Sequence, residues 1–83
     1  MSIWYTGHME EIDFHPHALF KMREREISAD EVINAVQDPD DVAPARLGRK
    51  CAYKKHGDYW LRVIFEQRGR SVLVITAYVT RRR

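Results

Sequence analysis

The chain has 83 residues, a formal net charge of +2 and 45% hydrophobic residues, which fits one small globular domain and excludes a disordered chain. Its single cysteine, Cys51, excludes an internal disulfide framework and fits a reducing compartment, so we expect a cytoplasmic protein. No apolar run approaches the roughly 18 residues of a membrane-spanning helix, and the N-terminus lacks the pattern of a secretory signal.

The net charge conceals a strong asymmetry between the two halves of the chain. Residues 1–42 hold 3 cationic and 10 acidic side chains, whereas residues 43–83 hold 11 cationic and 2 acidic ones. A C-terminal half this basic predicts an anionic partner, with nucleic acid first among the candidates. The alternative is that the acidic half packs against the basic half.

The first nine residues carry no function in our interpretation. Gly7-His8-Met9 resembles the scar of an expression vector, and Ile3-Trp4-Tyr5 is alternatively a short native strand. We therefore place a single domain at residues 10–80, followed by a basic tail at 81–83.

Two helices are predicted next. Pro16 suits the first position of a helix over residues 16–26, and this helix stacks His17, Lys21 and Arg25 along one face, away from an apolar face. That apolar face contains Ala18, Leu19 and Met22.

Ser28 opens the second helix, and Glu31 three residues later forms a capping box with it. The apolar face consists of Val32, Ile33 and Val36, and the run Asp38-Pro39-Asp40-Asp41 ends the helix.

The rest of the domain is predicted to be an antiparallel meander. Strands are expected over residues 50–56, 59–67 and 71–80, with a turn at Gly57-Asp58 and another at Arg68-Gly69-Arg70. A fourth strand could come from the N-terminus or from residues 42–47. The predicted fold class is α+β, with two N-terminal helices packed on a three- to four-stranded antiparallel sheet.

Alternation along the strands assigns the two faces of the sheet. In the second strand, Leu61, Val63 and Phe65 share one face, and Trp60, Arg62 and Ile64 share the other. In the third strand we expect Leu73, Ile75, Ala77 and Val79 to pack on the helices and Val72, Val74, Thr76 and Tyr78 to lie opposite. Our hypothesis is that Arg62, Thr76 and Tyr78 meet on the open face, joined by Tyr53.

Two motifs resemble those of a known family. His17-Ala18, Lys21-Met22 and Arg25-Glu26-Ile27-Ser28 follow its N-terminal pattern, and Val74-Ile75-Thr76-Ala77-Tyr78 follows its C-terminal one. Over residues 12–80 the chain is thus similar to the domain-of-unknown-function 4258 family, which belongs to the superfamily of RelE-like and barnase–colicin-like ribonuclease toxins. The chain departs from the family at Lys21, where arginine is usual, and at Glu26, where glycine is usual.

The resemblance implies a RelE-like fold and the toxin of a prokaryotic toxin–antitoxin system, a metal-independent endoribonuclease with RNA, free or ribosome-bound, and an antitoxin as partners. Such cleavage needs a base for the ribose 2′-hydroxyl, cations for the phosphorane and an acid for the 5′-oxygen. The expected catalytic residues are His17 as base, Arg62 and Tyr78. The expected RNA-binding residues are Lys21, Arg25, Arg49, Tyr53 and Thr76.

Other interpretations stay open. The same basic sheet could serve a non-catalytic module that binds RNA or protein, or a decayed toxin that still binds its antitoxin. A homodimer is open too. We expect no cofactor and no metal, because His15-Pro16-His17 offers no further ligand set, and we expect Cys51 to be a small buried residue.

Overall fold

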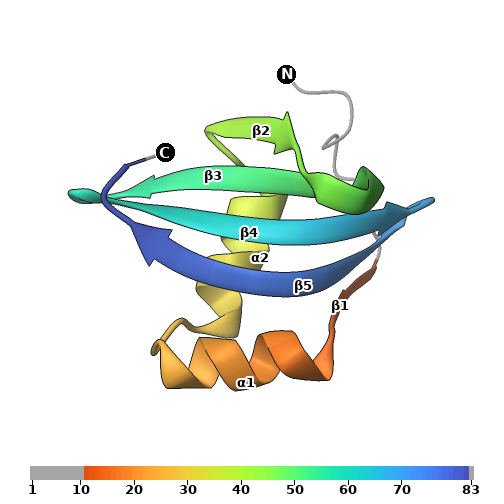
Figure 1. Ribbon diagram of the computed structural model, residues 1–83, viewed down its shortest axis with the longest axis horizontal. Coiled ribbons are helices and arrows are strands. Elements are labelled where there is room, and N and C mark those ends of the chain that lie inside the picture. Colours follow the sequence, from red (N-terminus) through yellow and green to blue (C-terminus); the bar gives the residue numbers. More distant parts are fainter. Residues whose placement is uncertain (1–10, 83) are drawn as a thin grey trace.

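The structure, a computed structural model, describes residues 11–82, which form two helices and a five-stranded mixed sheet (Figure 1). The strand order across the sheet is β1-β5-β4-β3-β2. The strands are β1 (Glu11–Phe14), β2 (Asp41–Pro44), β3 (Lys50–His56), β4 (Tyr59–Arg68) and β5 (Ser71–Thr80). The helices are α1 (Pro16–Glu24) and α2 (Ala29–Gln37), and a short 3-10 turn, η1 (Arg46–Gly48), connects β2 to β3.

The α+β class and the meander of β3, β4 and β5 are confirmed, but the prediction of a purely antiparallel sheet of three to four strands is wrong. Strand β2 overlaps the expected segment 42–47, whereas β1 lies at residues 11–14, after the N-terminal segment that was expected to form a strand, and runs parallel to β5. Strand β1 has only four residues, and its partner lies about sixty residues later in the chain. Such a pairing leaves no local signal in the sequence. The segment Ile3-Trp4-Tyr5 lies outside the described residues.

Helix α1 ends two residues earlier than expected. Arg25 is the C-cap, and Glu26 adopts a left-handed backbone with φ 56°. That conformation favours glycine, the residue that the resemblance gives as usual at this position. At the other end, the His17 backbone N–H donates to Nδ1 of His15 at 3.0 Å, so His15 caps the helix.

The predicted capping box of α2 is confirmed. The backbone N–H of Glu31 donates to the Ser28 hydroxyl at 3.1 Å, and the backbone N–H of Ser28 donates to the Glu31 carboxylate at 2.9 Å. These bonds satisfy helix-end donors that would otherwise lack partners. They also lower the pKa of the Glu31 carboxyl below its usual value, the backbone hydrogen bond from Ser28 contributing most.

Both helices leave one face of the sheet open. Helix α2 packs against β3 and β4 on one face, while α1 packs against β5 (Figure 1). The core between these layers includes fully buried Phe65, Val63, Val72, Val74, Val32 and Val36. Neither described helix is long and apolar enough to cross a membrane.

The face assignment is confirmed for β4 and partly wrong for β5. Leu61, Val63 and Phe65 are buried on the helix side as predicted, whereas Val72 and Val74, predicted on the open face, are buried in the core. The cause is a β-bulge. Phe65 pairs with Val74 and Ile64 with Thr76, so Ile75 is an extra residue that reverses the alternation. Leu73 and Ile75, predicted to pack on the helices, are therefore not in the core, and Val79 is exposed.

Candidate functional site

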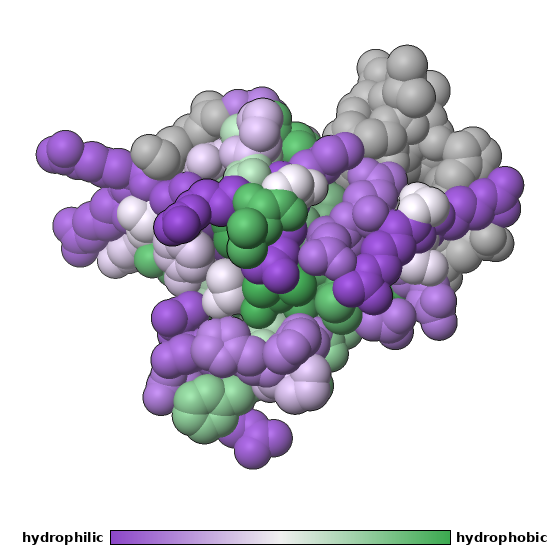
Figure 2. Space-filling model, turned by 45° about the vertical axis from the view of Figure 1, so that its right-hand side comes forward, coloured by the Kyte–Doolittle hydropathy of each residue, from purple (hydrophilic) through white to green (hydrophobic). Residues whose placement is uncertain are grey.

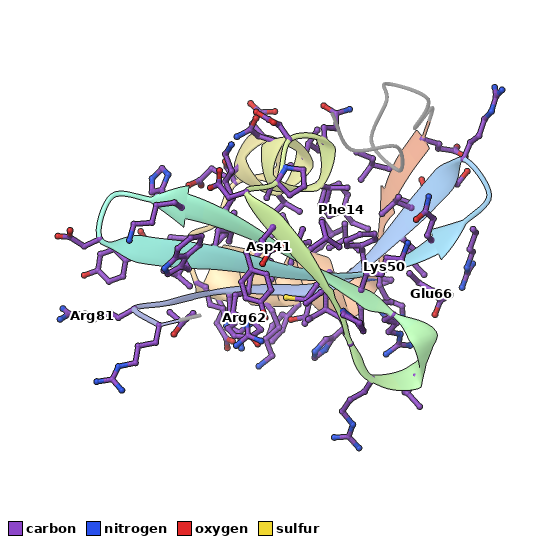
Figure 3. All side chains as sticks on the ribbon, turned by 90° about the horizontal axis from the view of Figure 1, so that it is seen from above. Phe14, Asp41, Lys50, Arg62, Glu66 and Arg81 are labelled. Carbon is purple, nitrogen blue, oxygen red and sulfur yellow. The ribbon has the colours of Figure 1, made fainter. Side chains whose placement is uncertain are left out.

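Three side chains form a row across the open face of the sheet. Arg62 on β4 pairs in register with Tyr53 on β3 and with Tyr78 on β5. Directly paired residues on adjacent strands lie on the same face. The predicted grouping of Arg62, Tyr78 and Tyr53 is therefore present in the structure, and Figure 3 shows Arg62 on the side of the sheet opposite α2.

The Arg62 guanidinium lies between the two aromatic rings. Its central carbon is 5.2 Å from the Tyr53 ring centroid and 5.1 Å from that of Tyr78, both within cation–π range. One terminal nitrogen of Arg62 donates to the Tyr53 hydroxyl at 3.3 Å. The Nε atom of Arg62 is buried and has no hydrogen-bond partner among residues 11–82.

Arg62 is held in its charged form. Burial alone would lower its pKa, but interactions with the Cys51 sulfur and with the Tyr78 and Tyr53 side chains outweigh burial and raise the pKa above the ordinary arginine value. A thiol is only a weak acceptor and leaves most of the hydrogen-bonding capacity of the guanidinium unused. The site therefore holds a fixed cation with donor capacity that an anionic ligand can use.

Arg25 extends the row beyond β5. Its guanidinium carbon lies 5.9 Å from the Tyr78 ring centroid, so Tyr78 is flanked by two cations. One terminal nitrogen of Arg25 donates to the Ala77 backbone carbonyl at 2.8 Å, which ties the end of α1 to β5. Tyr53, Arg62, Tyr78 and Arg25 thus alternate aromatic and cationic groups, and we call these four residues the ladder.

A pocket of about 310 Å³ opens beside the ladder, under the loop that connects β2 and β3. Arg46 and Arg49 of that loop line it together with Arg62. In Figure 3 the loop lies on the same side of the sheet as Arg62. The other lining residues are Pro44, Ala45, Cys51, Tyr53, Ile64 and Tyr78.

Arg49 shares the Glu66 carboxylate with Arg68. Nε of Arg49 donates to Glu66 at 3.3 Å, and Nε of Arg68 donates to its other oxygen at 2.8 Å. Hydrogen bonds from Arg68 and then Arg49 lower the pKa of the Glu66 carboxyl, which stays ionised. One carboxylate facing two guanidiniums leaves this end of the face with a net positive charge.

The remaining predicted site residues lie away from the pocket lining. Thr76 is on the open face, in register with Ile64, but does not line the pocket. Lys21 forms an ion pair with Glu24 at 3.3 Å on α1. His17 is exposed in the first turn of α1. At about 1.5 Å per residue, His17 lies about 12 Å along the helix from Arg25.

Sequence reasoning missed Arg46 and assigned no site role to Cys51 or Ile64, which line the pocket. The position of Arg46 depends on how the β2–β3 loop folds back, with the Ala45 N–H donating to the Arg49 carbonyl at 2.8 Å. Nothing in the sequence specifies that turn. By contrast, Cys51 and Ile64 could have been placed by alternation, because they pair in register one row along from Tyr53 and Arg62.

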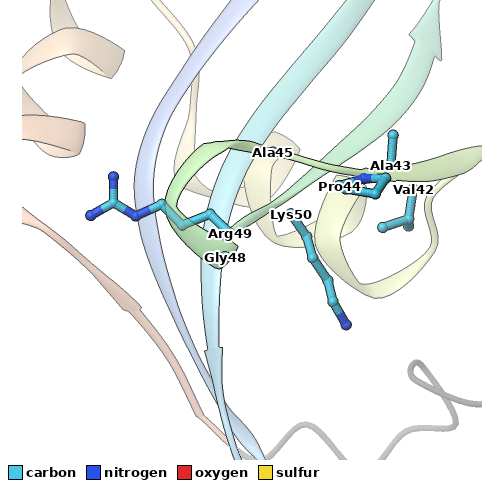
Figure 4. A pocket seen from close by; sticks show the side chains of 7 residues that line it. All are labelled: Val42, Ala43, Pro44, Ala45, Gly48, Arg49 and Lys50. Atoms are coloured by element: carbon cyan, nitrogen blue, oxygen red, sulfur yellow. The ribbon is translucent and has the colours of Figure 1, made fainter.

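A second pocket, of about 390 Å³, shares part of the same loop (Figure 4). Its lining is mainly apolar and comprises Val42, Ala43, Pro44, Ala45, Gly48, Arg49 and Lys50. The Arg49 and Lys50 side chains leave the loop in different directions (Figure 4), and Lys50 donates to Gln67 at 3.1 Å. This second pocket lacks the paired tyrosines of the first, so we place the candidate site at the ladder.

In an oblique view, Figure 2 shows an apolar group near the centre of the visible surface with hydrophilic residues around it. Such a surface offers both stacking or apolar contact and ionic contact. Among the described residues, no three His, Cys, Asp or Glu side chains come together in a way that could hold a metal ion.

Residues 14–79 match the DUF4258 family, a domain of unknown function. The chain belongs to the DUF4258 family. The family membership expected from the motifs at His17–Ser28 and Val74–Tyr78 is thereby confirmed. No curated protein and no solved structure matches the chain. No comparison links DUF4258 to RelE-like toxins, and that relation enters below as part of a proposal.

Within this DUF4258 domain, the two family motifs meet at the ladder. Arg25 comes from the N-terminal motif and Tyr78 from the C-terminal one, and their contact joins the end of α1 to β5. Arg62, from the neighbouring strand β4, contacts Tyr78 as well and completes the arrangement.

Proposed function

We propose that this protein is a RelE-like, metal-independent endoribonuclease, the toxin of a prokaryotic toxin–antitoxin pair, which binds RNA across the open face of its sheet in the cytoplasm. The observation that carries the proposal is Arg62, a charged guanidinium held between Tyr53 and Tyr78 with a buried, unpartnered Nε. Phosphate oxygens are suited to guanidinium donors, and nucleobases are suited to aromatic faces.

In the proposed reaction, the ribose 2′-hydroxyl attacks the adjacent phosphorus, and the 5′-oxygen leaves with a proton. Arg62 donates hydrogen bonds to the phosphate oxygens, whose negative charge grows in the phosphorane. We assign protonation of the leaving 5′-oxygen to Tyr78, and the register that pairs Tyr78 on β5 with Arg62 on β4 supports this assignment. Arg25, Arg46 and Arg49 bind neighbouring phosphates of the RNA strand.

His17 stands apart from this arrangement. A general base must lie within hydrogen-bond reach of the 2′-hydroxyl beside the phosphate at Arg62, directly or through one water. About 12 Å of helix separates His17 from Arg25, so the proposed role of His17 as the base that takes the 2′-hydroxyl proton requires His17 to approach the ladder when RNA binds. Cleavage by a His17→Ala variant therefore tests a separate part of the proposal from the Arg62 and Tyr78 variants. An antitoxin would inhibit the enzyme by covering the cationic open face with an acidic segment.

A second candidate function is a non-catalytic RNA-binding module. The observation that favours it is the chemistry of the pocket lining, in which the described side chains supply guanidinium, phenol and thiol groups but neither imidazole nor carboxylate. A phenol is a poor base near neutral pH. Binding then needs the same cations and rings but no proton acceptor.

The test is incubation of the purified protein with end-labelled RNA in EDTA, with and without ribosomes. The enzyme predicts discrete fragments that end in 2′,3′-cyclic phosphate, lost in Arg62→Lys and Tyr78→Phe. Arg23→Ala is the matched control, because Arg23 is an exposed arginine of α1 that does not line the pocket. Intact RNA under all conditions, with salt-dependent binding lost in Arg62→Ala, would favour the binding module. Absence of both cleavage and binding would refute both functions.

A further inference from the structure

Leu47, at the tip of the β2–β3 loop, has an unusual combination of conformation and exposure. Its backbone is left-handed, with φ 61° and ψ 33°, and its side chain is 83% exposed. A left-handed backbone costs free energy for a residue with a Cβ, and an exposed leucine gains little from packing within the domain. The fold itself offers no compensation for leucine at this position.

The neighbours of Leu47 belong to the candidate site. Arg46 precedes it, Arg49 follows two residues later, and both line the pocket beside the ladder. Gly48 also has a positive φ, 74°, so two consecutive left-handed residues form the tip. Strained residues of this kind concentrate at ligand-binding loops, where the bound molecule supplies the missing contacts.

The flanking charges indicate which ligand could contact Leu47. An apolar side chain between two guanidiniums is complementary to a chain that alternates anionic and planar apolar groups, which describes a single RNA strand. A purely apolar partner would leave both arginines without an anionic ligand, and a purely anionic partner would leave Leu47 exposed.

We infer that Leu47 is a recognition residue that packs against one nucleobase of the RNA while Arg46 and Arg49 contact the flanking phosphates. This inference rests on the proposed function and adds to it the element that contacts a base. Leu47 stands in the chain between Arg46 and Arg49, which line the pocket together with Arg62, so we expect the base that it contacts to neighbour the phosphate at Arg62.

The experiment measures binding of a short, fluorescently labelled single-stranded RNA by anisotropy, together with urea unfolding of each variant. Leu47→Asn keeps a residue that tolerates the left-handed backbone but removes the apolar surface, and Leu47→Gly removes the strain as well. Both are expected to bind RNA about tenfold more weakly, from loss of the buried apolar contact, while their unfolding midpoints stay equal or rise. Leu47→Met, which keeps the apolar surface, is expected to bind like the wild type.

Two controls locate the contact. Leu19→Ala removes an exposed leucine of α1, 49% exposed, and is expected to leave RNA binding unchanged. A series of oligonucleotides, each with one abasic position, identifies the base. At one position the difference between wild type and Leu47→Asn should disappear, because the contacted base is already missing.

The outcomes distinguish failure of the inference about Leu47 from failure of the proposed function. If Arg62→Ala abolishes binding while all Leu47 variants bind like the wild type, the inference is wrong and the proposed function stands. If the Leu47→Asn defect is equal on every abasic oligonucleotide, the leucine does not contact a base and the inference is again wrong. If the wild type does not bind RNA, the proposed function and the inference fail together.

Discussion

Replacing Arg62 by methionine removes the central guanidinium of the ladder but keeps an unbranched side chain of comparable reach. A residue that serves to hold the sheet together should be costly to lose, whereas one kept for a ligand should be nearly neutral for folding. The contacts of Arg62 allow the approximate size of the change in the free energy of unfolding to be worked out.

The contributions of Arg62 to stability have opposite signs. A buried, unsatisfied donor such as its Nε costs about 1–3 kcal/mol. Two cation–π contacts, at 5.1 and 5.2 Å, stabilise the fold by about 0.5–2 kcal/mol each. The hydrogen bond to the Tyr53 hydroxyl is long, at 3.3 Å, and contributes less than about 1 kcal/mol. Methionine also regains part of the ring contact through its sulfur. The expected net change is within about 1 kcal/mol.

The assay is urea unfolding followed by circular dichroism, with Phe65→Ala as the reference. Phe65 is fully buried three residues along the same strand, and its truncation is expected to cost about 3–5 kcal/mol. Arg62→Met should in addition abolish RNA binding. If Arg62→Met loses more than about 2 kcal/mol of stability, the guanidinium is a structural tie of the sheet and the reasoning that assigns it to a ligand is refuted.

Three further predictions concern the ends of the helices. Ser28→Ala removes the capping box and should lower the free energy of unfolding by about 1 kcal/mol at pH 7. Because the pKa of Glu31 is depressed in the folded state, the stabilisation by the Glu31 carboxylate is present above the ordinary pKa of 4.5 and is lost as the pH falls through the folded pKa. The difference in unfolding free energy between wild type and Ser28→Ala, measured by urea unfolding, should therefore become smaller in acid. Glu26→Gly, at φ 56°, should leave stability unchanged or raise it by up to about 1 kcal/mol in thermal unfolding. Arg25→Ala removes the bond to the Ala77 carbonyl and should lower stability by about 1–2 kcal/mol and also weaken RNA binding.

Local signals in the sequence were sufficient for the helices and the meander. Pro16 and the Ser28 capping box mark the helix starts, because each solves the problem of unpaired N–H groups at a helix end. The turn at Gly57 has the positive φ, 63°, that the hairpin between β3 and β4 requires. These features are determined by a few neighbouring residues and can therefore be predicted from the sequence.

Features that depend on contacts between distant segments could not be predicted from the sequence. The parallel pairing of β1 with β5 joins chain segments about sixty residues apart, and the bulge at Ile75 depends on how β5 fits against β4. Because one extra residue reverses every later side chain, the assignment failed for Val72 and Val74 but held for Thr76 and Tyr78, which lie beyond the bulge.

The candidate site likewise contains residues that the sequence could predict and residues that it could not. Arg62 could be singled out because a charge between apolar strand residues needs a partner or a ligand, and the meander brings Tyr53 and Tyr78 beside it. The prediction that His17, Lys21 and Arg25 lie along one face required an unbroken helix over residues 16–26. The helix ends before Arg25, which turns toward Tyr78 and leaves the other two on α1.

The charge asymmetry of the chain had two explanations, and the contacts distinguish where each applies. Three contacts join the basic half to the acidic half at the end of the domain where α2 and β3 meet. They are Lys54 with Asp38 at 3.5 Å, His56 with Glu31 at 3.9 Å, and the Lys55 backbone N–H with Asp40 at 2.7 Å. Only the first of these pairs a fixed cation with a carboxylate, so packing of one half against the other accounts for the charge of Lys54 but not for that of Lys55, whose ammonium lies over the Trp60 ring.

The cations of the open face are arranged differently. Arg62 is in contact with two tyrosines, and Arg49 must share one carboxylate with Arg68. Within residues 11–82, no ion pair to a carboxylate involves Arg62, Arg25 or Arg46. Among the described residues, carboxylates therefore do not compensate the positive charge of these three arginines at the ladder and its pocket. Positive charge that the fold leaves uncompensated on one face attracts an anionic partner there, and its removal should reduce the salt dependence of RNA binding.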